Sequence, residues 1–116
     1  MNQKIYITQV STFLPNNPVS NDEMEEYLGK IKGLKSKSKP LILRSNQIKS
    51  RYYATDKNGN STHSIAEMAV KAIRKLCVDD FDPQNIELLT CGSASPDLMM
   101  PSLSLMVHGE LGIKPI

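Results

Sequence analysis

A nearly continuous apolar run at residues 86–91 constrains the fold of this chain more than any other feature. The run reads Ile-Glu-Leu-Leu-Thr-Cys, and it follows a turn signal at residues 82–85. Short apolar runs bounded by turn residues are typical of strands that are covered on both faces of a sheet. We therefore expect a buried strand here, packed beneath helices.

A strongly amphipathic segment precedes this run. Its apolar residues recur at i, i+3, i+4, i+7, i+8 and i+11, a spacing that predicts a helix with one buried face. Ser64 and Glu67 have the spacing of a capping box and predict where the helix begins. The expected inward positions are Ile65, Met68, Ala69, Ala72, Ile73 and Leu76.

A second helix is expected near the end of the chain. Pro101 suits a first helical turn, and Gly112 suits a helix end. Four apolar residues between them recur at helical spacing and are expected to face inward: Leu103, Met106, Val107 and Leu111.

The N-terminal half contains shorter elements. Residues 5–10 and 48–54 alternate enough to predict strands, and residues 15–18 and 56–60 carry turn residues. Ser20 and Glu23 have capping-box spacing, and the acids that follow favour a short helix to Leu28, ended by Gly29. Strand, helix, buried strand and helix are the pattern of an α/β unit.

The overall composition supports a packed structure. The chain has 116 residues, 40% of them hydrophobic, which is enough for one core. Because two or three strands would leave sheet surface uncovered, we expect the chain to be incomplete. It contains no apolar run long enough to cross a bilayer and no secretory signal, so we expect a cytoplasmic location and no membrane partner.

Charge is unevenly distributed. Residues 30–51 hold eight basic residues and no acid, whereas the rest of the chain carries six basic and twelve acidic residues. Within this basic segment, residues 30–40 are rich in Lys, Ser and Gly and predict a flexible, solvated loop. Three interpretations stay open: a solvated loop, a landing site for an acidic carrier protein and its phosphate, and nucleic-acid binding. The last is disfavoured because no nucleic-acid motif accompanies the charges, and we expect no nucleic-acid partner.

Three segments in this order resemble the β-ketoacyl-acyl-carrier-protein synthase III family of the thiolase superfamily. They are the opening strand from Ile5 to the Leu-Pro turn at Pro15, the stretch from Ile48 to Ala54, and the run from Cys91 to Gly112 with its Ser-rich turn, Pro101 and helix. Gln47 and Lys49 depart from the Gly and Arg usual in the family. The chain also has no Trp, whereas typical members stack a Trp on coenzyme A in the region of residues 30–40.

The resemblance implies that residues 1–116 are the N-terminal part of a thiolase-like ketosynthase domain, an incomplete first α/β half. Family members condense an acyl thioester with a malonyl thioester and need no cofactor or metal. The resemblance places the nucleophilic Cys and the assisting His and Asn beyond Ile116, so the isolated chain should be inactive. It also implies a homodimer that uses acyl carrier protein or coenzyme A thioesters.

The resemblance also implies candidate substrate-binding residues. Met100, before Pro101, corresponds to a residue that lines the partner's acyl pocket, although simple interface packing is an equal alternative. Arg44 and Arg51 are candidates for a phosphate contact. A further hypothesis is a non-catalytic module that binds an acyl carrier protein or a full-length ketosynthase.

Cysteine and histidine residues give weaker signals. Cys77 and Cys91 lie fourteen positions apart with no second pair, which indicates reduced thiols and neither a zinc site nor a disulfide framework. Cys91 matches a strand end that precedes the catalytic Cys in the family, so we interpret it as non-catalytic. His63 is interpreted as a neighbour of the helix cap at Ser64 or as a solvent-exposed residue, and His108 as a surface residue. A Cys91–His108 dyad lacks an identifiable orienting group.

Overall fold

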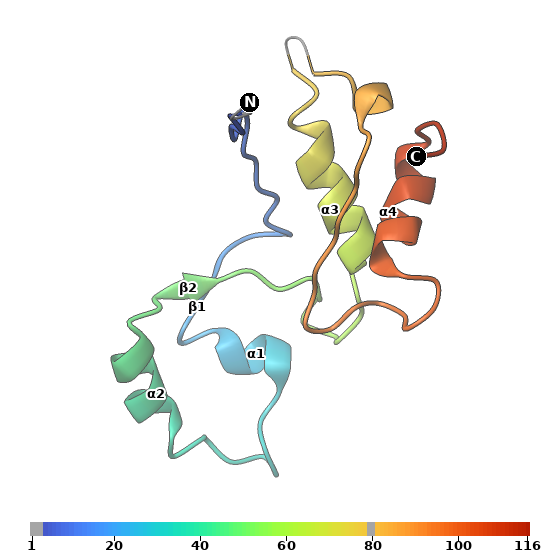
Figure 1. Cartoon of the computed structure of the whole chain (residues 1–116). Coiled ribbons are helices and arrows are strands. Elements are labelled where there is room, and N and C mark those ends of the chain that lie inside the picture. Colours follow the sequence, from blue (N-terminus) through green and yellow to red (C-terminus); the bar gives the residue numbers. More distant parts are fainter. Residues whose placement is uncertain (1–3, 79–80) are drawn as a thin grey trace. The chain divides into compact units, whose positions relative to one another are not determined.

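The computed structural model describes residues 4–78 and 81–116, which form two units (Figure 1). One unit joins the residues up to Phe13 with Ser64–Ile116, and the other is Leu14–His63. The first contains α3 (Ile65–Arg74), the 3₁₀ turn η1 (Pro83–Asn85) and α4 (Leu103–Leu111). The second contains β1 (Val19–Ser20), α1 (Met24–Leu28), α2 (Lys39–Asn46) and β2 (Ser50–Arg51).

Helices α3 and α4 lie side by side and enclose the core of their unit (Figure 1). The buried cluster comprises Ala66 and Val70 from α3 with Leu103 and Val107 from α4, and Val107 is 0% exposed. Because each helix contributes an apolar stripe that the other covers, the pair supplies mutual burial that neither helix has alone. The predicted helices at both places are confirmed.

The termini of both helices follow local signals. Ser64 and Glu67 form the predicted capping box at the start of α3. In α4 the Oγ of Ser102 accepts a hydrogen bond from the backbone N–H of Leu105, so the helix begins after Pro101 rather than with it. Gly112 ends α4 with a left-handed φ of +65°, a conformation that glycine adopts at little cost.

The buried face of α3 is rotated from its predicted centre. Ala66 and Val70 are the most buried residues, whereas Ile65, Ala69 and Ile73 lie at the edge of the cluster. Ala66 is buried in the cluster with Leu103 and Val107 of α4, although it is not part of the predicted stripe. The inward positions predicted for α4 are confirmed, since Leu103 and Val107 are buried and Met106 and Leu111 pack against them.

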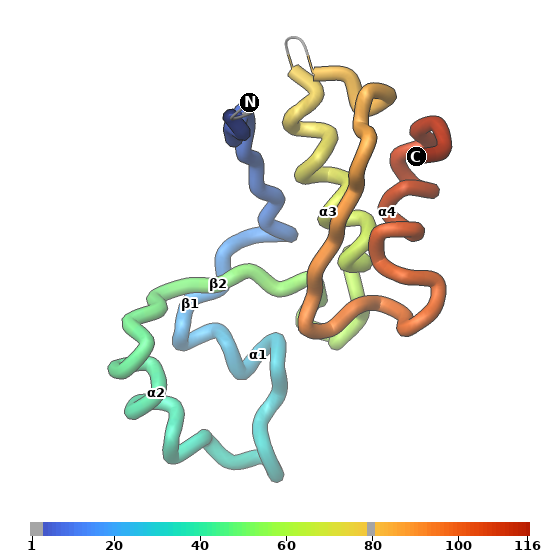
Figure 2. The backbone as a smooth tube through the Cα atoms, in the orientation of Figure 1, coloured from blue at the N-terminus to red at the C-terminus, as the bar shows by residue number. Residues whose placement is uncertain are grey.

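The apolar run at 86–91 is extended but is not the predicted strand. Figure 2 shows it passing along α3, and Leu89 and Cys91 pack against the α3–α4 cluster. Leu88 points the other way and is 80% exposed. A strand needs a hydrogen-bonded neighbour, and the described residues supply none to this run, so only one of its two faces is covered.

The predicted strand at residues 5–10 is also absent from the structure. Ile5, Ile7 and Val10 are all largely exposed. The chain is anchored only after this segment, where the Oγ of Ser11 donates to the carbonyl of Ala72 and Lys75 Nζ donates to the carbonyl of Thr12. An apolar segment without a sheet partner has no ladder to join, which explains the wrong prediction.

The second unit holds the only sheet that the described residues form. β1 pairs antiparallel with β2, with Val19 opposite Arg51 and Ser20 opposite Ser50. The strand predicted over 48–54 is therefore confirmed for two residues only. Beyond it, Asn16 Nδ2 donates to the carbonyl of Tyr53 at 2.7 Å, and Tyr53 stacks on Tyr27 of α1.

Helix α1 precedes the basic segment 30–51, and helix α2 lies within it. α1 ends at Gly29 as predicted, and the hydroxyl and backbone N–H of Ser20 donate to the Glu23 carboxylate just before it begins. α2 begins at Lys39, with Pro40 in its first turn, so the expected loop 30–40 ends at Ser38. Gln47 ends α2 with a left-handed φ of +56°.

The described residues thus mix four α-helices with a two-stranded antiparallel sheet. This composition is compatible with the expected α/β class. The covered sheet expected beneath the helices is not formed by the part of the chain that the structure describes, because the expected strands at 5–10 and 86–91 have no hydrogen-bonded neighbours there.

Candidate functional site

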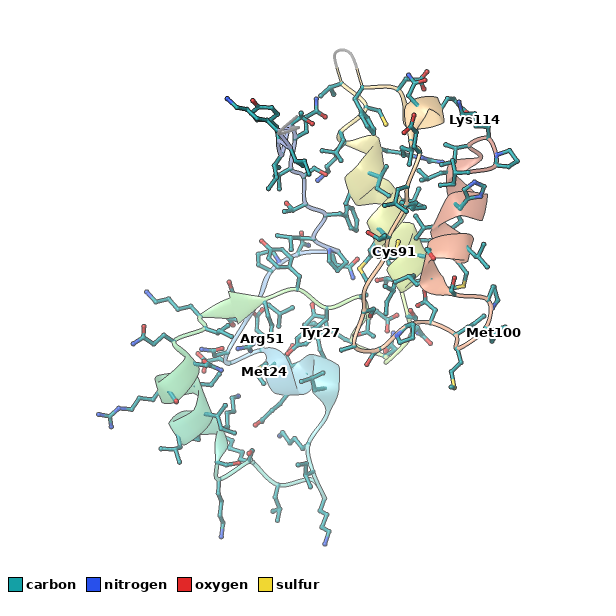
Figure 3. The ribbon with its side chains drawn as sticks, viewed as in Figure 1. Met24, Tyr27, Arg51, Cys91, Met100 and Lys114 are labelled. Atoms are coloured by element: carbon teal, nitrogen blue, oxygen red, sulfur yellow. The ribbon has the colours of Figure 1, made fainter. Side chains whose placement is uncertain are left out.

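An open cleft lies between α1 and α2 in the Leu14–His63 unit. It has a volume of about 270 Å³, and the turn that joins the two helices closes one side. Met24, on α1, marks the cleft wall in Figure 3. The other lining residues are Glu25, Leu28, Gly29, Lys30, Ile31, Leu34, Ser36, Lys39, Ile42 and Leu43.

A tight turn holds two aliphatic side chains at the mouth of the cleft. Ile31 and Leu34 form an antiparallel bridge, with the Leu34 N–H donating to the Ile31 carbonyl at 3.0 Å. Lys32 and Gly33 between them have left-handed φ angles of +52° and +71°. This backbone conformation leaves Ile31 and Leu34 largely exposed beside the cleft.

Two lysines and one glutamate are the charged residues that line the cleft: Lys30, Lys39 and Glu25. Lys39 Nζ lies 3.6 Å from Glu25 Oε1, and both side chains are largely shielded from solvent. Lys30 also lines the cleft and forms no ion pair with any residue that the structure describes. An apolar wall with an uncompensated ammonium group at its rim can hold a molecule that has both an apolar part and a negative charge.

The two candidate phosphate contacts differ in their surroundings. Arg44 lies in the last turn of α2 and is exposed. Arg51 lies on β2, where its Nη2 donates to Asn21 Oδ1 at 2.7 Å. Nη1 of Arg51 is buried and has no hydrogen-bond partner among residues 4–78 and 81–116. No contact brings the two guanidinium groups together within this unit.

Met100 belongs to the other unit and lies on the loop before α4 (Figure 3). Its side chain is 83% exposed, and Met99 is still more exposed. Asp97, three residues earlier, fixes this loop to the start of α3, because its carboxylate accepts from the backbone N–H groups of Ile65 and Ala66. Reasoning from the sequence missed this contact, because an aspartate in a loop does not reveal a partner 31 or 32 residues away.

The cysteines are free, as expected. Cys91 packs beside the α3–α4 cluster, and burial raises the pKa of its thiol above the usual 9.0. A thiol with a raised pKa is mostly protonated at neutral pH and is a poor nucleophile. His108 Nε2 lies 3.0 Å from the Lys114 carbonyl, and the described residues show no hydrogen bond between His108 and Cys91.

The remaining features add little chemistry. A second cavity of about 430 Å³ lies beside α4 in the other unit and includes Leu88, Leu105 and Glu87 in its wall. In the described ranges, no group of His, Cys, Asp and Glu side chains has the arrangement of a metal site. No described helix is long and apolar enough to span a membrane.

Comparison with known proteins gives a weak but consistent similarity. The chain is 27% identical over 107 residues to beta-ketoacyl-acyl-carrier-protein synthase III of Lactococcus lactis subspecies lactis, and equally to that of subspecies cremoris. The match covers 91% of this chain and 29% of each relative, so the chain spans less than a third of their length. No protein-family model matches. The similarity supports a distant relationship to synthases of this type.

Proposed function

We propose that this chain is the N-terminal part of a thiolase-like ketosynthase that condenses an acyl thioester with a malonyl thioester. The observation that carries the proposal is the similarity to two synthases of this type along 91% of the chain. The match involves less than a third of each relative, as expected for one part of a longer enzyme. Nothing in it favours the alternative of a non-catalytic interaction module.

The chemistry would take place outside this chain. A condensing enzyme of this kind needs a cysteine thiolate to accept the acyl group and hydrogen-bond donors to stabilise the developing enolate and oxyanion. Cys91 does not suit the first role, because its thiol is partly buried against apolar side chains and its pKa is raised. We place the nucleophilic Cys, together with the assisting His and Asn, beyond Ile116, and we expect the 116-residue chain to be inactive alone.

Binding and assembly are the roles we assign to this part. Arg44 is exposed at the end of α2 and is available to a phosphate of coenzyme A or of a carrier protein. Arg51 has an N–H group at Nη1 with no hydrogen-bond partner among the described residues, but this group is buried, so a phosphate oxygen would accept from it only after the side chain moves. The exposed Met100 would line the acyl pocket of a partner subunit in a cytoplasmic homodimer, where a flexible thioether adapts to different chains.

Condensation by the complete gene product tests the proposal. The natural polypeptide is isolated from its source cells, its mass is measured, and it is incubated with an acyl-coenzyme A and radiolabelled malonyl carrier protein. We expect a polypeptide longer than 116 residues that releases labelled carbon dioxide and forms a β-ketoacyl product. A longer product that binds both substrates without condensing them would contradict the proposal, as would a natural product of 116 residues.

A further inference from the structure

The cleft between α1 and α2 has an apolar wall that is open to solvent. Leu28, Ile31, Leu34 and Ile42 line it, and each side chain is between 54% and 78% exposed. Four exposed aliphatic side chains around one concavity form an unfavourable surface in water, and an apolar molecule that covers them gains free energy. Met24 and Leu43, which are less exposed, form the remaining apolar lining.

The lysines interleaved with this wall restrict what can cover it. Lys30 and Lys39 line the cleft, and Lys32, Lys35 and Lys37 lie in the segment between them. Ammonium groups are almost never buried without a partner, so this surface is poorly suited to packing against another apolar protein surface. A ligand with an apolar chain and an anionic head complements both the wall and the rim.

We propose that this cleft binds one amphipathic anion, a molecule with a single unbranched apolar chain and a carboxylate or phosphate head. The volume of about 270 Å³ is below the usual range of ligand pockets and suits one chain of moderate length better than a ring system. The head lies toward Lys30, because Lys39 is already paired with Glu25 at 3.6 Å. The second cavity, beside α4, is less suited to an anion because its wall carries Glu87 and no lysine.

A chain-length series tests the apolar part of the proposal. Straight-chain carboxylates of six to twelve carbons, each kept below the concentration at which it forms micelles, are titrated into the 116-residue chain and followed by calorimetry and amide NMR. We expect the affinity to rise about fourfold for each added methylene until the cleft is filled. Alkyl phosphates should follow the same trend, and primary alcohols of equal length should bind more weakly at every length.

Three variants test the assigned groups. Leu34→Ser removes part of the apolar wall, so it should lower the affinity for carboxylates and for alcohols alike, by about tenfold. Lys30→Gln should lower the affinity for the carboxylates several-fold and leave the affinity for the alcohols unchanged. Glu25→Gln removes the competing carboxylate and releases Lys39, so carboxylates should bind several-fold more tightly, again with no effect on alcohols.

Matched controls come from exposed positions of the other unit. Ile7→Ser and Lys4→Gln remove comparable groups that line neither cavity and should leave every affinity unchanged. Sensitivity to Leu105→Ser with none to Leu34→Ser would assign the ligand to the cavity beside α4 and overturn the proposal. Binding to phosphatidylglycerol vesicles with none to the monomeric acids would overturn it in favour of a bilayer surface.

This inference stands apart from the proposed condensation. Binding is measured directly on this chain, with no thioester, carrier protein or catalytic residue involved. Loss of the expected chain-length dependence would leave the condensing-enzyme proposal untouched, and failure of condensation by the complete product would leave the cleft assignment untouched.

Discussion

The Asp97 carboxylate accepts a 2.8 Å hydrogen bond from the backbone N–H of Ile65 and a second, at 2.9 Å, from the next residue of α3. The capping box satisfies two more N–H groups, because Ser64 Oγ accepts from Glu67 and the Glu67 carboxylate accepts from Ser64. All four N–H groups from Ser64 to Glu67 thus have acceptors, two of them supplied by a distant loop. The start of α3 and the loop before Met100 therefore stabilise one another.

Replacing Asp97 should loosen both the helix start and the loop. Asp97→Ala removes two acceptors and a negative charge at a helix N-terminus, so we expect a loss of about 1–2 kcal/mol and a melting temperature several degrees lower. Thermal unfolding measures the loss, and hydrogen exchange at Ile65 and Ala66 locates it. Asp22→Ala, at an exposed aspartate of the other unit, is the matched control and should leave hydrogen exchange at Ile65 and Ala66 unchanged. Unchanged exchange at Ile65 in the Asp97 variant would show that the contact contributes nothing.

Val107 is the side chain on which the α3–α4 core depends most. It is 0% exposed, and Val107→Ala would leave a cavity between the two helices, so we expect a loss of about 2 kcal/mol in the free energy of unfolding. Leu105→Ala, on the exposed side of the same helix, should cost less than about 0.5 kcal/mol. Urea denaturation of the two variants compares them directly. Equal losses would mean that the helix pair does not hold the core described above.

Local signals explain which helices could be predicted from the sequence. The capping box of α3 and the Gly112 end of α4 depend on residues within one turn of each other, and both predictions hold. The strands depend on neighbours elsewhere in the chain. Residues 5–10 and 86–91 have strand-like composition, yet no described segment pairs with them. The sequence pattern indicates that a segment can form a strand, but a sheet forms only where another segment lies beside it to pair with.

The candidate cleft was only partly visible in the sequence. The basic segment and its lack of acids were evident, and they left open a solvated loop, a landing site for an acidic carrier protein and its phosphate, and nucleic-acid binding. The apolar wall was not evident, because Leu28 and Ile42 come from two helices separated by the turn at Ile31 and Leu34. Spacing along one element cannot reveal a surface assembled from two helices and a turn. For the same reason the Asn21 contact of Arg51 could not be foreseen.

Titration of Glu23 should report whether the contact between Ser20 and Glu23, just before α1, is formed. The Ser20 hydroxyl and then its backbone N–H donate to this carboxylate and hold the pKa of Glu23 below its usual 4.5. A depressed pKa means that the stabilisation is fully present above pH 4.5 and is lost as the pH falls through the lower value of the folded state. NMR titration of the Glu23 side chain measures this value directly.

Two serine variants make the Glu23 titration decisive. Ser20→Ala removes the hydroxyl donor and should move the pKa of Glu23 back toward 4.5. Ser36→Ala removes a hydroxyl that bonds to Ser38 instead, and it should leave the Glu23 titration unchanged. A Glu23 pKa at 4.5 in the unmodified chain would mean that the Ser20 contact is absent in solution.

Reactivity of Cys91 distinguishes a packing thiol from a nucleophile. Burial raises the pKa of this thiol above 9.0, so alkylation by iodoacetamide should be slow at pH 7 and should accelerate with a midpoint above pH 9. Cys77→Ser isolates Cys91 for the measurement, and the same variant in denaturant gives the rate of an ordinary thiol. Because a catalytic cysteine requires a lowered pKa, rapid labelling at pH 7 in the folded chain would overturn the interpretation of Cys91 as packing. Slow labelling that becomes fast on unfolding would confirm that the α3–α4 cluster, which Cys91 contacts, suppresses its thiolate.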